Sequence, residues 1–100
     1  MLISFIIPAF NASQTIVRCL DSIYSLVIPE TEYEVIVIDD CSNDDTVTVI
    51  ESYALSHENL TLLRQSENHR QGAARNRGLE IAKGQYIFYL SIVMTLLTPE

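Results

Sequence analysis

The stretch VIVIDDCSNDDT, residues 35–46, decides how this chain is expected to fold. Four apolar residues run without alternation into Asp39 and Asp40, which is typical of a strand covered on both faces of a parallel sheet. A polar turn follows, in which Asn43 or Asp44 can cap a helix. That helix would carry Val47, Ile50 and Tyr53 on one face. The stretch therefore predicts a strand, a turn and a helix in succession.

The same unit recurs along the chain. Asn11 and Ser13 are candidate N-caps of a first helix, and Pro8 is expected to end the strand before it. The apolar stripe of that helix is Ile16, Leu20, Ile23 and Val27. The expected strands cover residues 2–8, 33–39, 59–65 and 85–90, and the expected helices lie within 10–27, beyond 43, and within 71–84. This alternation predicts an α/β fold of four mainly parallel strands and three helices, in three layers with right-handed crossovers.

The bulk composition limits the classes of function. One hundred residues make one small domain or a piece of a larger one, and the missing helix after the fourth strand favours an N-terminal piece. The formal charge of −7 argues against a nucleic-acid partner, because phosphate backbones need a positive surface. The longest apolar run, residues 86–97, is about half the ~20 residues of a membrane span. We expect neither a signal peptide nor a transmembrane segment in this chain.

The cysteines and histidines show no metal-site spacing. Cys19 and Cys41 are expected to be free thiols, which fits the cytoplasm or the cytoplasmic face of a membrane. His57 and His69 have no second His or Cys at ligand spacing, so we expect both at the surface.

Polar residues gather where the predicted strands end. Ligands of open parallel sheets bind beyond the carboxyl ends of the strands, and residues 8–11, 39–45 and 65–76 fall there. Asp40 ends a buried strand at this edge, so we expect its carboxylate to bind a ring N–H or ribose hydroxyls. For Asp44 and Asp45 we favour helix capping, because carboxylates are stabilised at a helix N-terminus.

The start of the third helix carries Arg70, Arg75 and Arg77. A helix N-terminus attracts anions, and an arginine one turn into the helix adds a charged donor for a diphosphate. Arg75 lies among small residues and close to Gly72, which allows close approach. We expect Arg75 to contact the ligand, and Arg70 and Arg77 to face solvent.

These segments together resemble the inverting family 2 glycosyltransferases, which have a Rossmann-like nucleotide-sugar-binding fold of the GT-A type. The matching pieces are SFIIPAFNASQTIVRCLDSI, YEVIVIDDCSNDDT, ENHRQGAARNRGLEIAKGQYIFYL and LLTPE, in the family's order and spacing. The resemblance covers essentially the whole chain. It implies that residues 1–100 are the N-terminal nucleotide-sugar-binding part of a truncated glycosyltransferase domain.

The resemblance implies a nucleoside-diphosphate sugar donor of the UDP or dTDP type, transferred to an acceptor hydroxyl. Asp40 would hold the base edge, supported by Asp39. The end of the first strand would line the base and ribose pocket with Pro8, Ala9, Phe10 and Asn11. The start of the third helix would border the ribose and diphosphate with Asn68, Gly72 and Arg75. No residue here is a candidate catalytic base, since the family's base lies in the C-terminal half.

The chain departs from the family at residues 91–94. The family expects an Asp-x-Asp-Asp motif, whose carboxylates hold Mg²⁺ or Mn²⁺ against the diphosphate, but this chain has Ser91, Ile92, Val93 and Met94. We therefore predict that this chain binds no metal cofactor as written. If these residues are encoded TCG ATA GTG ATG and Thr95 begins with AC, a shifted frame reads GAT AGT GAT GAC. That frame encodes Asp-Ser-Asp-Asp, so two compensating shifts in the gene or its sequencing could produce the departure.

Three functions stay open at this point. The first is a donor-binding half of a glycosyltransferase with impaired transfer, and whether this chain alone is an active enzyme is not decided. The second is a non-catalytic nucleotide-binding or interaction remnant. The third, a phosphoacceptor signalling domain, is set behind them because such domains carry the acid pair after the first strand. A sheet with an uncovered last strand also favours pairing, so a homodimer is one expected partner.

Overall fold

The computed structural model describes residues 1–65 and 71–91, including the side chains of all but residues 71–75. Strands and helices alternate along this part of the chain, as expected. The strands are β1 (Ile3–Ala9), β2 (Tyr33–Asp39), β3 (Leu60–Arg64) and β4 (Tyr86–Tyr89). The helices are α1 (Ile16–Tyr24), α2 (Thr46–Ala54) and α3 (Gln71–Ile81), with a short 3₁₀ helix over Glu30–Glu32.

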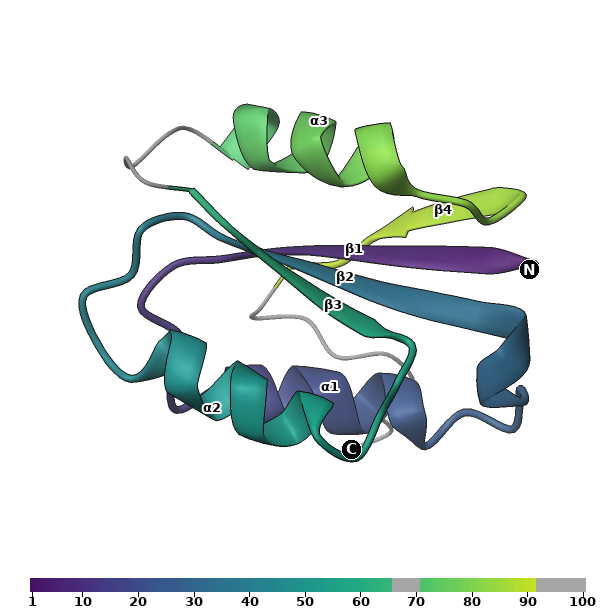
Figure 1. Cartoon of the computed structure of the whole chain (residues 1–100), viewed down its shortest axis with the longest axis horizontal. Helices are drawn as coiled ribbons and strands as arrows, with labels where there is room; N and C mark the ends of the chain where they lie inside the picture. The colour runs from purple at the N-terminus through teal and green to yellow at the C-terminus, as the bar shows by residue number, and fades with distance from the viewer. Residues whose placement is uncertain (66–70, 92–100) are drawn as a thin grey trace.

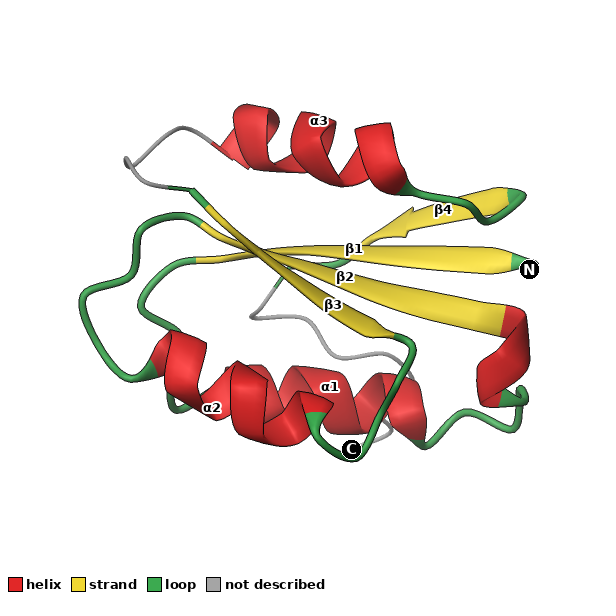
Figure 2. Ribbon diagram, viewed as in Figure 1, coloured by secondary structure: helices red, strands yellow, loops and turns green. Residues whose placement is uncertain are grey.

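The four strands form one parallel sheet in the order β3-β2-β1-β4. Helices α1 and α2 cover one face of the sheet, and α3 covers the other, which gives three layers (Figures 1 and 2). This confirms the predicted α/β class with parallel strands. All strands point the same way, so the carboxyl ends of β1, β2 and β3 lie at one edge of the sheet.

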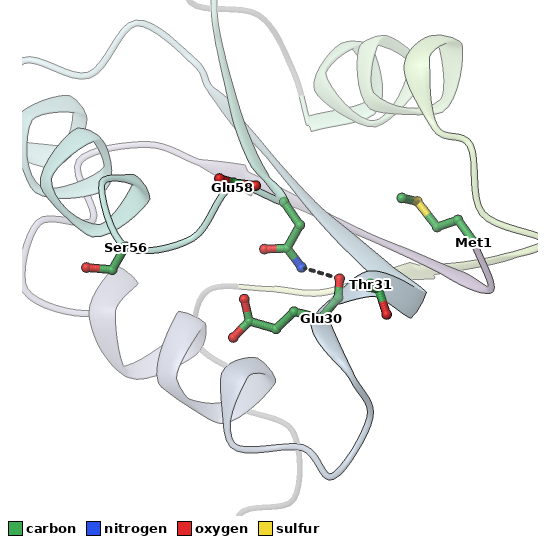
Figure 3. Close-up of a pocket in the computed structure, with 6 residues that line it drawn as sticks. Met1, Glu30, Thr31, Ser56 and Glu58 are labelled. Carbon is green, nitrogen blue, oxygen red and sulfur yellow. Dashed lines mark hydrogen bonds between the residues drawn. The ribbon is translucent and has the colours of Figure 1, made fainter.

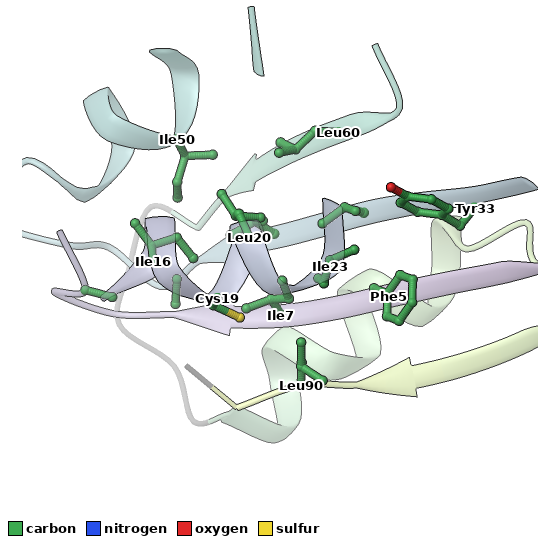
Figure 4. Packing of buried hydrophobic residues seen from close by; sticks show 14 of the residues in the cluster. Phe5, Ile7, Ile16, Cys19, Leu20, Ile23, Tyr33, Ile50, Leu60 and Leu90 are labelled. Atoms are coloured by element: carbon green, nitrogen blue, oxygen red, sulfur yellow. The ribbon is translucent and has the colours of Figure 1, made fainter. Parts of the chain in front are cut away.

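Side chains of β1 and β2 alternate between two hydrophobic clusters. The odd-numbered residues face α1 and α2 and form the larger cluster (Figure 4). Helix α1 contributes Ile16, Cys19, Leu20 and Ile23, which are fully buried. The smaller cluster on the α3 side is built on Ile6, Ile36 and Ile38. Both faces are therefore covered, which explains why neither strand shows polar alternation in its sequence.

Burial also explains the chemistry of one cysteine. Cys19 has no access to solvent, and desolvation raises the pKa of its thiol to about 11. Both cysteines are free thiols, as expected. Cys19 is therefore a core residue.

The first helix differs from its prediction at both ends. Its N-cap is Thr15, which makes no side-chain capping bond, so Asn11 and Ser13 were wrong as caps. The Asn11 side chain instead accepts a hydrogen bond from the Asn43 backbone N–H. The helix ends at Tyr24, so Val27, which was predicted in its apolar stripe, lies outside the helix and is fully exposed. Pro8 lies within β1, which ends one residue later at Ala9.

Candidate functional site at the carboxyl ends of the strands

The ends of β1 and β2 are in direct contact. Ala9 is paired with Asp39, and the Asp40 backbone N–H donates to the Ala9 carbonyl oxygen at 2.8 Å. This register brings the predicted contact residues of β1 next to the predicted acid pair. Pro8 and Ala9 are buried, whereas Phe10 is 45% exposed. Phe10, the first residue after β1, thus adds accessible apolar surface to this edge.

Asp39 holds the turn that follows β2. Its side chain is fully buried, and its Oδ2 accepts a hydrogen bond from the Ser42 backbone N–H at 3.0 Å. The Ser42 hydroxyl donates to Oδ1 of the same carboxylate. Between them, Cys41 has a φ of 63°, in the left-handed region that non-glycine residues rarely adopt. Asp39 therefore stabilises a strained turn directly after β2.

Asp40 lies where three strands end. Its side chain is 7% exposed, and its Oδ1 accepts a hydrogen bond from Gln65 Nε2 at 3.2 Å. Gln65 directly follows β3, and its backbone N–H donates to the Asp39 carbonyl oxygen at 2.9 Å. The sequence had assigned no role to Gln65. Its position as the first residue beyond a strand at the ligand edge was the available signal.

Hydrogen bonds join the loop after β1 to the loop after β2. The Asn11 backbone N–H donates to Ser42 Oγ at 2.9 Å, and the Asn43 N–H donates to Asn11 Oδ1 at 2.8 Å. One residue on, the Ala12 N–H donates to Thr46 Oγ1 at 2.8 Å. Asn11 has a φ of 48°, so both loops contain a residue in the left-handed region. The two loops form one hydrogen-bonded unit, which we call the clasp.

Asp44 caps the second helix, as favoured from the sequence. Its Oδ1 accepts hydrogen bonds from the hydroxyl and the backbone N–H of Thr46, the latter at 3.0 Å. Its Oδ2 accepts the Ser13 N–H at 3.3 Å. The hydrogen bonds from Thr46, followed by those at Ser13, lower the pKa of Asp44 to about 2. Asp45 is the formal N-cap residue but makes no side-chain capping bond.

The third helix begins over the same edge (Figure 1). It packs against β1 and β2, and its first turn contains the backbone of Gly72. The contacts predicted for the side chains of Gly72 and Arg75 stay predictions. Asn68, His69 and Arg70 lie outside the described residues. Arg77 is exposed, as expected.

A pocket of about 520 Å³ lies at the opposite end of the sheet (Figure 3). It is lined by Met1, Glu30, Thr31, Ser56, Glu58 and Asn59. Two carboxylates in its wall carry the same sign of charge as a diphosphate, which disfavours it as a donor site.

Beside this pocket, His57 is half-buried, so only part of the expected surface histidine is exposed. Its ring lies 3.9 Å from that of Tyr24 and 5.0 Å from that of Tyr53, between centroids. Its Nδ1 is 3.3 Å from Glu30 Oε1. Aromatic packing explains the position of His57 without any ligand.

The described residues form neither a metal-binding cluster nor a membrane-spanning helix. Residues 1–65 and 71–91 contain no group of three or more His, Cys, Asp or Glu that could hold a metal ion. Ser91 is half-buried, and residues 92–94 lie outside the described part. None of the described helices has the length and apolar character that crossing a membrane requires.

Comparison with known proteins identifies relatives. The family model described as Glycosyl transferase family 2 matches residues 4–91. Poly(ribitol-phosphate) beta-glucosyltransferase of Bacillus spizizenii is 36% identical over 91 residues, which cover 90% of this chain and 14% of that protein. Glycosyltransferase AglE of Haloferax volcanii is 34% identical, over 88% of this chain and 29% of its own. The chain thus spans less than a third of these relatives.

Solved structures agree with the sequence relatives. TarS 1-349 of S. aureus in complex with UDP-GlcNAc has a TM-score of 0.87 at 33% identity, over 92% of this chain and 26% of that one. Mannosyltransferase PcManGT of Pyrobaculum calidifontis, in complex with GDP-Man and Mn²⁺, has a TM-score of 0.90 at 28% identity. That match covers 96% of this chain and 28% of the other. The resemblance inferred from the sequence motifs is confirmed, as is the GT-A fold.

Proposed function

Because this chain belongs to glycosyl transferase family 2, we propose that it binds a nucleoside-diphosphate sugar at the carboxyl ends of β1, β2 and β3. The observation that carries the proposal is the position of Asp40, a nearly buried carboxylate where three strand ends converge. The donor would be of the UDP or dTDP type, and the structure of TarS with UDP-GlcNAc supports the former.

Each predicted contact has a chemical role in this proposal. Asp40 accepts hydrogen bonds from the base or ribose, and the exposed ring of Phe10 offers a face on which a base can stack. Pro8, Ala9 and Asn11 flank that ring in the sequence and shape the backbone that carries it. At the start of α3, the helix N-terminus and Arg75 bind the diphosphate, with Asn68 and Gly72 beside it.

Residues 1–100 act in this proposal as the N-terminal donor-binding part of a glycosyltransferase. The chain covers 14% and 29% of the first two relatives, which leaves room for an acceptor pocket and a catalytic base outside it. The complete reaction would be an inverting displacement, in which a general base deprotonates the acceptor hydroxyl. We expect this chain alone to transfer sugar poorly or not at all.

The residues at the family's metal motif do not fit a divalent cation. Ser91 offers one hydroxyl, and Ile92, Val93 and Met94 offer no side-chain oxygen, whereas Mg²⁺ and Mn²⁺ prefer oxygen ligands. We therefore propose donor binding that does not depend on a metal in this chain. Sequencing the gene across codons 91–95 tests the frameshift origin, and codons other than TCG ATA GTG ATG AC would exclude it.

Titration calorimetry with UDP, with and without Mn²⁺, tests the proposed function. We expect UDP to bind in both conditions with similar affinity, and GDP, the probe for a different base, to bind more weakly. An affinity for UDP that rises steeply with Mn²⁺ would contradict the proposal that residues 91–94 hold no metal ion. If UDP, dTDP and GDP bind only weakly or not at all, the alternative holds, namely a non-catalytic nucleotide-binding remnant or an interaction module.

We also propose that β4 mediates pairing between copies of this chain. Within the described residues β4 is an edge strand, and Tyr86, Phe88 and Tyr89 are each 45% to 59% exposed. Edge strands with exposed aromatic residues tend to pair. Sedimentation of the wild-type chain and of Phe88→Lys should show a dimer for the first and a monomer for the second.

We propose that the chain lies in the cytoplasm, either free or attached to the cytoplasmic face of a membrane. The two free thiols fit this location.

A further inference from the structure

We propose that Asn11 and Ser42 are positioning residues, which fasten the clasp and so hold Phe10 and Asp40 in their binding arrangement before a nucleotide arrives. The inference rests on the proposed function, since it concerns the same site. It differs from the sequence prediction for Asn11, which expected that side chain to line the pocket. It also gives a role to Ser42, which the sequence left without one.

Ser42 is the centre of the clasp. Its hydroxyl accepts the Asn11 backbone N–H at 2.9 Å and donates to the Asp39 carboxylate, so one oxygen joins the loop after β1 to the end of β2. Its own backbone N–H donates to the other oxygen of Asp39 at 3.0 Å. Asp39 is fully buried, so this anchor point is fixed by the core. A serine at position 42 thus ties an exposed loop to a rigid strand.

Asn11 completes the connection from the other side. Its Oδ1 accepts the Asn43 N–H at 2.8 Å, while its own N–H is bound by Ser42. The residue is exposed, and its φ of 48° is one that asparagine tolerates better than most residues. An exposed asparagine with this backbone and these two partners acts on the neighbouring loop. Its contribution to nucleotide binding would therefore be indirect.

The clasp lies between the two groups that the ligand would meet. Phe10 precedes Asn11, and Asp40 is two residues before Ser42, so each ligand group is attached directly to one half of the clasp. The two left-handed residues, Asn11 and Cys41, set the direction in which each loop leaves its strand. Strained backbone of this kind persists only where surrounding contacts hold it in place. Loss of the clasp would let the loops relax, and binding would then have to order them again.

The test compares UDP affinity and melting temperature in Ser42→Ala, Asn11→Gly and the double variant. Glycine at position 11 tolerates the left-handed backbone and removes the side chain that accepts the Asn43 N–H. We expect about tenfold weaker UDP binding in each single variant, with a melting temperature close to that of the wild type. Because both residues serve one connection, the double variant should lose no more than about the larger single effect. Additive losses would overturn the inference, since they indicate separate contacts with the nucleotide.

Two further variants separate positioning from general structure. Ser42→Thr keeps the hydroxyl and should restore most of the affinity. Ser56→Ala, a matched change at the opposite end of the sheet, should bind UDP as the wild type does. Ser42→Ala binding within twofold of the wild type would overturn the inference. Failure of the wild-type chain itself to bind UDP is a different result, which would overturn the proposed function and the positioning role with it.

Discussion

The two ends of the sheet hold their polar groups in different ways. At the carboxyl end, side-chain oxygens of one loop bind backbone N–H groups of another, as Ser42 and Thr46 do for Asn11 and Ala12. At the amino end, side chains bind one another and pack as rings, as in the cluster of Tyr24, Tyr53 and His57. The first arrangement sets the shape of exposed loops. The second joins helices and strands, so we infer that it serves stability.

The amino end also contains a buried carboxylate. Glu34 Oε2 accepts the Ser4 hydroxyl at 2.5 Å and the Lys83 backbone N–H at 2.6 Å. The Gly84 N–H donates to the Ser4 hydroxyl oxygen at 2.8 Å. These bonds connect β1 and β2 to the segment that leads into β4. A change at this end should therefore reduce stability and leave nucleotide affinity unaltered.

The largest effect on stability is expected from Gly84→Ala. A Cβ on Gly84 would lie 2.5 Å from the Ser4 nitrogen and 2.6 Å from the Ile3 carbonyl carbon, and backbone atoms cannot easily move aside. We expect a loss of about 3 kcal/mol in the free energy of unfolding, measured by urea titration. UDP affinity of the folded fraction should stay at the wild-type value.

Gly78→Ala is the matched control for this prediction. Its Cβ would meet Ile6 Cγ2 at 2.6 Å and Ile38 Cδ1 at 2.9 Å, which are side-chain atoms and not backbone atoms. Alanine also has a helix propensity about 1 kcal/mol better than glycine, which offsets part of the cost. The loss should therefore be smaller than for Gly84→Ala. Equal losses would show that backbone contact is not what limits position 84.

At the carboxyl end, Asp40→Asn should have the opposite effect: it should weaken UDP binding and leave stability unchanged. Asparagine can still accept the hydrogen bond from Gln65, so the fold should be kept. Loss of the charge should weaken UDP binding by about 10- to 100-fold, corresponding to roughly 1.5–3 kcal/mol for a hydrogen bond to a charged group. Glu58→Gln, in the pocket wall at the amino end, is the control and should bind UDP normally. If Asp40→Asn binds UDP with wild-type affinity, the Asp40 carboxylate does not contact the nucleotide.

The sequence predicted the fold well because its signals are strong and repeated. Unbroken apolar runs specify covered parallel strands, and each strand end places polar residues at one edge. The ends of the helices were harder to predict from the sequence. Asn11 and Ser13 have the composition of N-caps, but the Asn11 side chain accepts the Asn43 N–H, and the Ser13 backbone N–H donates to the Asp44 carboxylate. Local preference gave way to contacts between residues more than thirty positions apart.

The candidate site was predictable in location and only partly in detail. The strand order brought Ala9 next to Asp39, as the topology requires. Ser42 and Gln65 were missed because their importance depends on which side chain lies opposite in space, and composition does not carry that information. The two tyrosine rings that pack on half-buried His57 also come from elements that its local sequence does not indicate.

A smaller effect is expected from Tyr24→Phe at the amino end. The Tyr24 hydroxyl donates to Asn59 Oδ1 at 2.7 Å, and Asn59 Nδ2 in turn donates to the Tyr33 carbonyl oxygen at 3.0 Å. Removal of the hydroxyl should cost about 1 kcal/mol of unfolding free energy and leave UDP affinity unchanged. Tyr53→Phe should cost less, because its bond to Asp21 is exposed. A larger loss for Tyr53→Phe would contradict this ranking.

The smallest effect concerns pH and Asp44, whose pKa is lowered by hydrogen bonds from Thr46 and Ser13. Its folded-state pKa of about 2 lies below the ordinary value of 3.8. The stabilisation is therefore present above pH 3.8 and is lost as the pH falls through 2. Asp44→Asn should be slightly less stable than the wild type at pH 5, and the difference should shrink towards pH 2. Urea titrations at several pH values measure it.

Asp45→Asn is the control for this pH dependence, since the Asp45 side chain makes no capping bond. It should follow the wild-type stability curve through the same pH range. If Asp45→Asn flattens that curve and Asp44→Asn does not, the hydrogen bonds to Thr46 and Ser13 are not the source of the effect. If the curve flattens only in Asp44→Asn, the loop bonds at the carboxyl end also contribute to stability, and the contrast between the two ends is one of degree.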